Sequence, residues 1–109
     1  MDERYRELTA RLKKAVLAGP GVTEPALRQA VHDYAAHPGD IVPPEVPPAL
    51  HEYVRKVARQ AHTVTDEDMA ALRQAGVSQD TLYEITVAAA LGAGLGRLQR
   101  GLAALEGEI

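Results

Sequence analysis

"LYEITVAAALGAGLGRLQRGLAAL", residues 82–105, combines a helical pattern of apolar residues with four glycines. Glycine inside a helix costs about 1 kcal/mol relative to alanine, so four of them in one helix require a steric explanation. Ala88, Gly92 and Gly96 recur every four residues and form a flat strip on which the backbone of another helix can lie closely. The stretch therefore predicts a long helix packed tightly against a second helix, either of the same chain or of another subunit.

The same helix has a second apolar face, made of leucines at intervals of four and three residues. Such a narrow seam suits a partner helix. The chain has no Phe and no Trp, so its core has little side-chain volume, and association of subunits would bury further apolar surface. We therefore expect a homo-oligomer, or a complex with another protein, whose interface contains Ala88, Gly92, Gly96, Leu91, Leu95, Leu98, Leu102 and Arg97.

Helical spacing of apolar residues recurs along the rest of the chain, and no segment alternates with a period of two. The first predicted helix ends at the breaker GPG, residues 19–21, and the second begins near Thr23, its predicted N-cap. Pro47 and Pro48 suit the entry of a third helix, because its first turn does not need their missing amide hydrogens. The apolar faces of the first and third predicted helices are Tyr5, Leu8, Leu12, Ala15 and Val16, and Leu50, Tyr53, Val54, Val57, Ala58 and Ala61.

A short fourth helix is marked at both ends in "AHTVTDEDMAALRQAG", residues 61–76. Thr65 is its predicted N-cap, Asp68 the partner in a capping box and Gly76 the left-handed stop, and Ser78 then caps the last helix. The chain is therefore predicted to be all-α, with about five helices. A single domain of residues 1–109 is expected, divided into an N-terminal helical hairpin (1–36), a Pro-rich linker (37–48) and a helical core (49–107).

Composition and charge argue against several classes of function. The formal net charge is −3 and the basic residues are interleaved with acids, which does not suit a nucleic-acid binder. The absence of cysteine removes disulfides, thiolate nucleophiles and Cys-based zinc sites. The longest apolar run has about twelve residues, against the roughly twenty that a membrane helix needs. The charged N-terminus lacks the apolar stretch of a signal peptide, so we expect a cytoplasmic protein with no membrane partner.

The stretch "VTDEDMAALRQAGVSQDTLYEITVAAALGAGLGRL", residues 64–98, resembles the carboxymuconolactone decarboxylase and alkylhydroperoxidase-D-like (AhpD-like) family of all-helical proteins. The resemblance is carried by a capped short helix ending in Ala-Gly, a small cap, an acid, an alanine-rich middle and an arginine, which are Gly76, Ser78, Glu84, residues 88–90 and Arg97. The first sixty residues match only in being helical.

The redox members of that family carry a CxxC motif followed by a histidine, and this chain has no cysteine. If Gly76 is aligned with the glycine that follows the motif, the motif positions fall on Ala61, Val64 and Asp68; if the match is to the second helical repeat of longer members, the motif segment is absent. In either case the resemblance implies a redox-inactive, AhpD-like core at 49–107 that is not a thiol peroxidase.

An acid-base site is the enzymatic hypothesis that remains, because decarboxylase members of the family depend on histidine and acidic residues. His62 ends the third predicted helix beside the acidic cap, and its combination with Glu84 and Asp66 gives the candidate catalytic residues. The structural alternative for Glu84 is an ion pair, with Arg97 of another chain or with a basic residue of the third helix. His51 begins "HEYVR", which lacks the second histidine of a zinc helix, so no metal is expected.

The expected function is therefore that of an assembly or partner-binding subunit. "GAGLG" neither follows a strand nor precedes Lys-Ser/Thr, so we expect no nucleotide and no other cofactor. Two alternatives are a small cofactor-free enzyme, decarboxylase-like or isomerase-like, near His62 and Glu84, and a small-molecule-binding module whose pocket lies between subunits.

Overall fold

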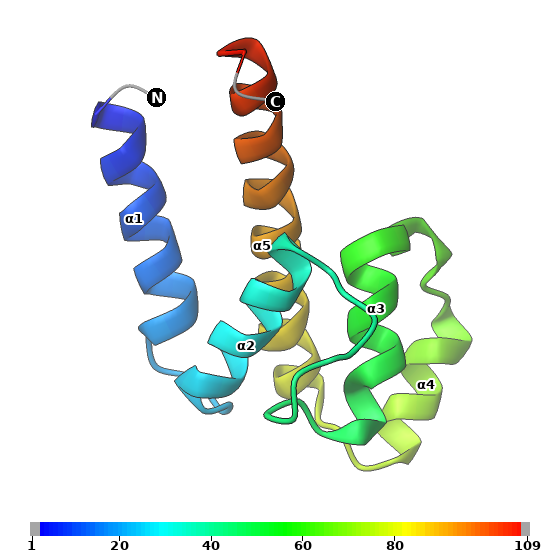
Figure 1. Ribbon diagram of the computed structural model, residues 1–109. Coiled ribbons are helices and arrows are strands. Elements are labelled where there is room, and N and C mark those ends of the chain that lie inside the picture. The colour runs from blue at the N-terminus through cyan, green and yellow to red at the C-terminus, as the bar shows by residue number, and fades with distance from the viewer. Residues whose placement is uncertain (1–2, 108–109) are drawn as a thin grey trace.

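The computed structural model describes residues 3–107, and all regular structure in that range is helical (Figure 1). The predicted all-α class and the five helices are confirmed. The elements in chain order are α1 (Glu3–Ala18), α2 (Pro25–Ala36), the 3₁₀ turn η1 (Pro48–Leu50), α3 (His51–Gln60), the 3₁₀ turn η2 (Ala61–Thr63), α4 (Asp66–Gln74) and α5 (Gln79–Leu105).

The small-residue strip of α5 lies against α2 of the same chain (Figure 1). A Cβ atom added to Gly92 would collide with the carbonyl oxygen of His32, and one added to Gly96 would collide with the carbonyl oxygen of Ala36. Ala88 between the same helices is fully buried. The close approach predicted from the glycines is therefore made within one subunit, and this strip is not free to receive a second one.

The hydrophobic core lies where α2, α3 and α5 meet. Its most deeply buried large side chains are Val31, Val46, Val54 and Ile85. The predicted apolar face of α3 is buried from Leu50 to Ala58, whereas Ala61 is exposed because the α-helix ends at Gln60. α4 contributes one buried residue, Leu72.

The proline-rich segment at 37–48 packs on the core of its own chain. Val42 and Val46 are buried, with 3% and 1% of their surface exposed. His51 forms a 2.7 Å hydrogen bond through Nε2 to the carbonyl oxygen of Val46. Arg59 donates to the carbonyl oxygens of Pro38 and Gly39. The prolines prevent a helix here, but the two valines between them still bury apolar surface.

The predicted caps of α4 and α5 are confirmed. The Thr65 hydroxyl accepts from the Asp68 amide at 3.1 Å, and the Asp68 carboxylate accepts from the Thr65 amide at 3.0 Å, which completes a capping box. Gly76 has a φ of +95°, the left-handed conformation expected of a helix stop. Ser78 accepts from the amide of Thr81. The predicted cap of α2 is wrong: this helix begins at Pro25 after Glu24, and Thr23 has another role.

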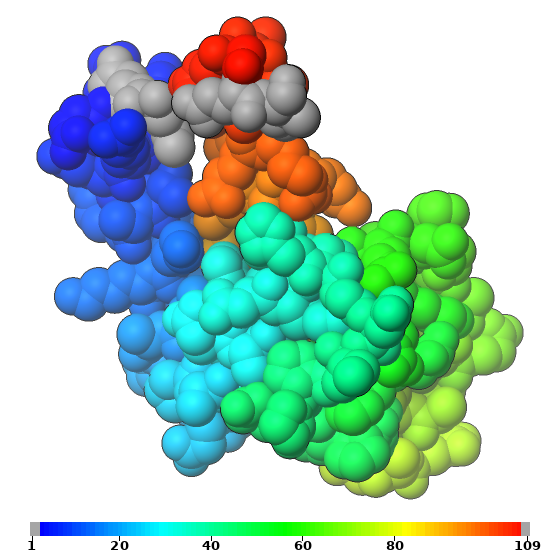
Figure 2. All heavy atoms as spheres, viewed as in Figure 1, coloured from blue at the N-terminus to red at the C-terminus, as the bar shows by residue number. Residues whose placement is uncertain are grey.

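Two arms project beyond the core, α1 and the C-terminal half of α5 (Figures 1 and 2). They run in opposite directions, and the molecule measures 46 × 28 × 24 Å. Leu17, near the end of α1, is the single fully buried residue of that helix. The predicted apolar face of α1 is left uncovered: Tyr5, Leu8 and Leu12 are about half exposed. Within residues 3–107 no helix has the length and apolar character to cross a membrane.

Candidate functional site

The three predicted catalytic residues are not joined into one site. His62 is exposed in η2, beyond the end of α3, and Asp66 is the exposed first residue of α4. Glu84 lies near the start of α5, at the opposite end of α3 from η2 (Figure 1). Among the described residues no hydrogen bond or ion pair links these side chains. The acid-base hypothesis therefore finds no support in their arrangement.

Glu84 is instead a structural link between α5 and the loop that joins α1 to α2. Its carboxylate accepts from the amides of Val22 and Thr23, at 2.8 and 2.9 Å, and from the Thr23 hydroxyl at 2.5 Å. These bonds, the Thr23 hydroxyl first, favour the ionised form and lower the pKa of Glu84 below its ordinary value. The partner of Glu84 is thus a loop backbone of its own chain, rather than the arginine or lysine expected from sequence.

Arg28, on α2, binds the same connection between α1 and α2. This side chain is 3% exposed, and its guanidinium donates to the carbonyl oxygens of Val16, Gly19 and Thr23. Arg28 therefore binds carbonyls at the C-terminal end of α1 while Glu84 binds amides of the following turn. We call Arg28 and Glu84 the loop clamp. Because Arg28 lies on α2 and Glu84 on α5, the loop clamp fixes the direction in which α1 leaves the core.

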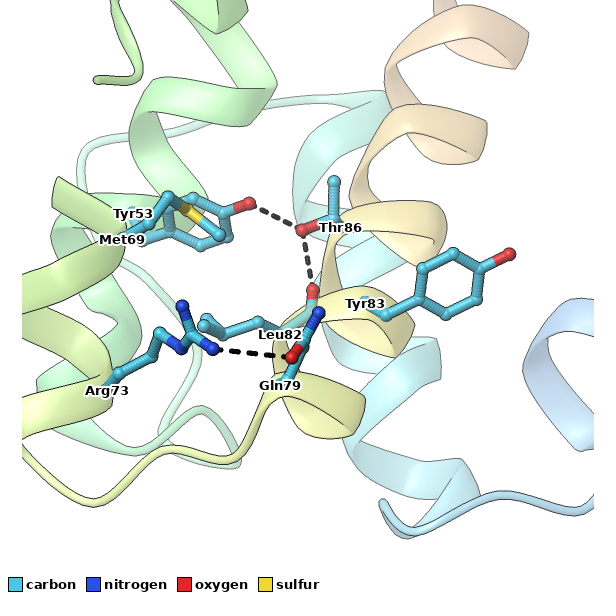
Figure 3. Close-up of a pocket in the computed structure, with 7 residues that line it drawn as sticks. All are labelled: Tyr53, Met69, Arg73, Gln79, Leu82, Tyr83 and Thr86. Atoms are coloured by element: carbon cyan, nitrogen blue, oxygen red, sulfur yellow. Dashed lines mark hydrogen bonds between the residues drawn. The ribbon is translucent and has the colours of Figure 1, made fainter. Parts of the chain in front are cut away.

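A pocket of about 300 Å³ opens between α3, α4 and α5 (Figure 3). Its wall is mainly apolar, and the residues that line it are Tyr53, Met69, Arg73, Gln79, Leu82, Tyr83 and Thr86. On one side the Tyr53 hydroxyl bonds to Thr86 Oγ1 at 2.5 Å, and Thr86 Oγ1 donates to the carbonyl oxygen of Leu82 at 2.6 Å. On the other side Arg73 donates to Gln79 Oε1 at 3.3 Å. The ring of Tyr83 points away from the other six residues, and Tyr83 is 70% exposed at the edge.

Arg73 is the one charged residue among those that line this pocket. The Thr86 hydroxyl hydrogen is used by the Leu82 carbonyl, so the Tyr53 hydroxyl donates to Thr86. Both hydroxyl hydrogens are thereby occupied inside the chain. The donors that remain for a ligand belong to Arg73, which makes its single hydrogen bond to Gln79 and no ion pair within the described chain, and to the amide of Gln79.

The predicted leucine seam is exposed only in part. Leu98 is 45% exposed and Leu105 is 85% exposed, whereas Leu91, Leu95 and Leu102 are half-buried. Arg97 is exposed. We define the arm surface as these five leucines together with the apolar face of α1: Leu91, Leu95, Leu98, Leu102, Leu105, Tyr5, Leu8 and Leu12.

The two halves of the arm surface face the same side of the molecule. Thr9 of α1 and Gln99 of α5 face one another across a pocket between the arms. Leu8 and Leu98 each precede these residues by one position, which turns them about 100° back around their helices. Because α1 and α5 are antiparallel, the same rotation brings both leucines to one side of the pair. The arm surface is therefore a single apolar face, two helices wide.

A buried histidine lies beside the arms. His32 is 4% exposed, and its Nδ1 bonds to the carboxylate of Asp33 at 2.9 Å. Its Nε2 is buried and has no hydrogen-bond partner within residues 3–107. His32 lies near the C-terminal end of α2, where its backbone packs against Gly92 of α5. In the part of the chain that is described, no three His, Cys, Asp or Glu residues are grouped so as to hold a metal ion.

No model of a known protein family matches this chain, and no curated protein and no solved structure matches it. The resemblance of residues 64–98 to the carboxymuconolactone decarboxylase and AhpD-like family therefore stays a prediction from the local pattern. Sequence reasoning did not find Arg28 or Arg73. The sequence did hold a signal that Arg28 is buried: it lies on the apolar side of a predicted helix, among Leu27, Val31 and Tyr34. Nothing in the local sequence distinguishes Arg73 from other exposed arginines.

Proposed function

We propose that this chain is an assembly subunit that pairs with a second copy of itself through the arm surface. The observation that carries the proposal is the exposure of Tyr5, Leu8 and Leu12 on the same side as the leucines of α5. A helix of 16 residues gains most of its stability from packing an apolar face, yet α1 leaves that face in water. A partner that covers the arm surface supplies the missing packing.

The shape of the arm surface favours a second copy over a single partner helix. From Leu91 to Leu105 it extends about 21 Å along α5, at 1.5 Å per residue, and it is two antiparallel helices wide. This is the form of one half of a four-helix bundle, and the same face on a second copy completes the bundle. A two-fold axis makes such an interface self-complementary.

Charge favours one arrangement of the bundle. α1 carries five basic and two acidic side chains, whereas the arm half of α5 has almost no charge on its apolar side. Two α1 helices that faced one another would bring like charges together. We therefore infer that α1 of one subunit packs on α5 of the other.

Sedimentation velocity over a range of protein concentrations tests this proposal. We expect a dimer, or a larger assembly with dimer symmetry, that dissociates on dilution. A strict monomer up to high micromolar concentration would contradict the proposal. We infer in addition that the chain is not a thiol peroxidase, because it has no cysteine to attack a peroxide.

A further inference from the structure

We propose that the pocket between α3, α4 and α5 binds a small aromatic monocarboxylate, with the carboxylate on Arg73. This inference concerns the core and does not depend on the pairing of the arms. It assigns to the chain a ligand site in addition to its assembly surface.

The size and lining of the pocket set the class of ligand. About 300 Å³ lies at the lower end of the range for small-molecule pockets, so the ligand is a single ring or a similarly small group. The lining offers the ring of Tyr53, the thioether of Met69 and the side chain of Leu82. Aromatic rings pack favourably on all three, and sulfur–aromatic contacts add to the apolar burial.

The polar groups set the charge of the ligand and its orientation. None of the lining residues is acidic, so an anion meets no repulsion from the wall. Tyr53 and Thr86 have used their hydroxyl hydrogens and offer no donor to a carboxylate. Arg73 keeps free N–H groups, because its hydrogen bond to Gln79 uses only Nη2 and is long at 3.3 Å. A guanidinium presents paired donors that match a carboxylate, so the carboxylate of the ligand binds at Arg73.

The ring of the ligand then lies toward Tyr53. Figure 3 shows Arg73 and Gln79 on one side of the pocket and Tyr53 with Met69 on the other. A ligand with its carboxylate on Arg73 places its apolar part against Met69, Leu82 and the ring of Tyr53.

The proposal is tested by titrating the full chain with benzoate, benzamide and acetate, followed by ¹⁵N–¹H correlation spectra and calorimetry. Benzamide keeps the ring without the charge, and acetate keeps the charge without the ring. We expect benzoate to bind with a dissociation constant in the millimolar range or tighter, with shifts confined to residues of α3, α4 and the first turns of α5. Benzamide and acetate should each bind about tenfold more weakly or worse.

Arg73→Gln provides the decisive comparison, with Arg6→Gln on the exposed surface of α1 as its matched control. Arg73 is exposed, so its replacement leaves the core intact. We expect Arg73→Gln to weaken benzoate about tenfold or more while leaving benzamide unchanged, and Arg6→Gln to change neither. Equal binding of benzoate and benzamide to the wild type, or unchanged benzoate binding to Arg73→Gln, would overturn the proposal. The proposal would also be overturned if benzoate shifted no resonance of the residues that line the pocket.

Discussion

The carboxylate of Glu84 binds both the amide and the hydroxyl of Thr23, a residue 61 positions earlier in the chain. The same carboxylate also binds the amide of Val22, and a Cβ on Gly21 would collide with it. Three donors from one turn therefore converge on one acidic side chain of α5. Glu84 thus anchors the base of α1 to the core, while Arg28 binds the carbonyls of Val16 and Gly19 at the C-terminal end of α1.

The Glu84 contacts predict an acid-sensitive stability. The folded-state pKa of Glu84 is lowered by its hydrogen bonds to Thr23 and Val22, so the carboxylate stabilises the fold above the ordinary glutamate pKa of about 4.3. This stability is lost as pH falls from that value through the folded-state pKa. Asp68 titrates in the same direction, because the hydrogen bond from Lys56 lowers its pKa. Denaturant unfolding between pH 2.5 and 6, a range chosen to bracket these values, measures the slope.

Glu84→Gln should flatten this pH dependence in part and leave the contribution of Asp68. The NH₂ group of the glutamine would replace one carboxylate oxygen and place a donor against the N–H donors of Val22 and Thr23. The variant should therefore be less stable at neutral pH. Glu45→Gln, on an exposed loop residue, is the matched control and should keep the wild-type slope. An unchanged slope in Glu84→Gln would show that Glu84 is not held in the folded state as described.

Removal of Arg28 should destabilise the chain strongly. Arg28→Met keeps most of the buried volume but leaves the carbonyls of Val16 and Gly19 without their donor. We expect a loss of about 2–4 kcal/mol in the free energy of unfolding, measured with denaturant. Arg55→Met is the control, because Arg55 makes only a 3.6 Å surface ion pair with Glu52 and should cost less than about 1 kcal/mol. Equal effects of the two substitutions would contradict the role given to Arg28.

The glycines of α5 should respond to alanine in opposite directions. At Gly92 and Gly96 the new methyl group would collide with backbone carbonyl oxygens of α2, which cannot move without separating the two helices. At Gly94 and Gly101 no atom of residues 3–107, apart from the adjacent backbone of α5 itself, lies within 4 Å of the added carbon. We expect Gly94→Ala and Gly101→Ala to stabilise the chain by about 0.5–1 kcal/mol each, through helix propensity. Gly92→Ala and Gly96→Ala should instead lower the thermal midpoint, and stabilisation at all four positions would contradict the close packing of α2 on α5.

The arm surface predicts that charge substitutions will dissociate the assembly. Leu8→Glu and Leu98→Glu, one on each arm, should each weaken self-association about 30-fold or more in sedimentation velocity. Both residues are already about half exposed, so the monomer should keep its helical circular dichroism spectrum. Ile41→Glu is the control, because Ile41 is 82% exposed and lies outside the arm surface. If Ile41→Glu dissociated the assembly and the two leucine variants did not, a different face would form the interface.

Local patterns predicted most of the secondary structure. The capping box of Thr65 and Asp68 and the stop at Gly76 depend on atoms within a few residues, so their sequence signals were sufficient. Thr23 shows the limit of such reasoning, since its hydroxyl donates to Glu84 instead of capping α2. A threonine before a helix can cap that helix or bind a distant side chain. The position of Glu84 on α5 decides between these two roles.

The candidate sites were harder to predict than the helices. The pocket of Tyr53 and Arg73 draws on three helices, and no spacing along one helix reveals a cavity between several. Val42 and Val46 show the same limit, because a segment without periodicity carries no signal of which side chains it buries. The sequence groups His62 with Glu84 because Glu84 lies in the resembling segment and His62 shortly before it. In the fold His62 follows the C-terminal end of α3, whereas Glu84 lies near Thr86, which bonds to Tyr53 in the first turn of α3.

The long helix α5 and its flat strip of small residues follow from the sequence, because glycine spacing and helical period are properties of one segment. Which surface fills the strip depends on the folded chain, and α2 fills it, with the carbonyls of His32 and Ala36 on Gly92 and Gly96. The leucine face of α5 carries an equally clear pattern, yet within residues 3–107 no segment covers it fully. A periodic pattern shows which face of a helix avoids water. It does not show which surface covers that face, because this depends on where the chain turns and how closely two backbones approach.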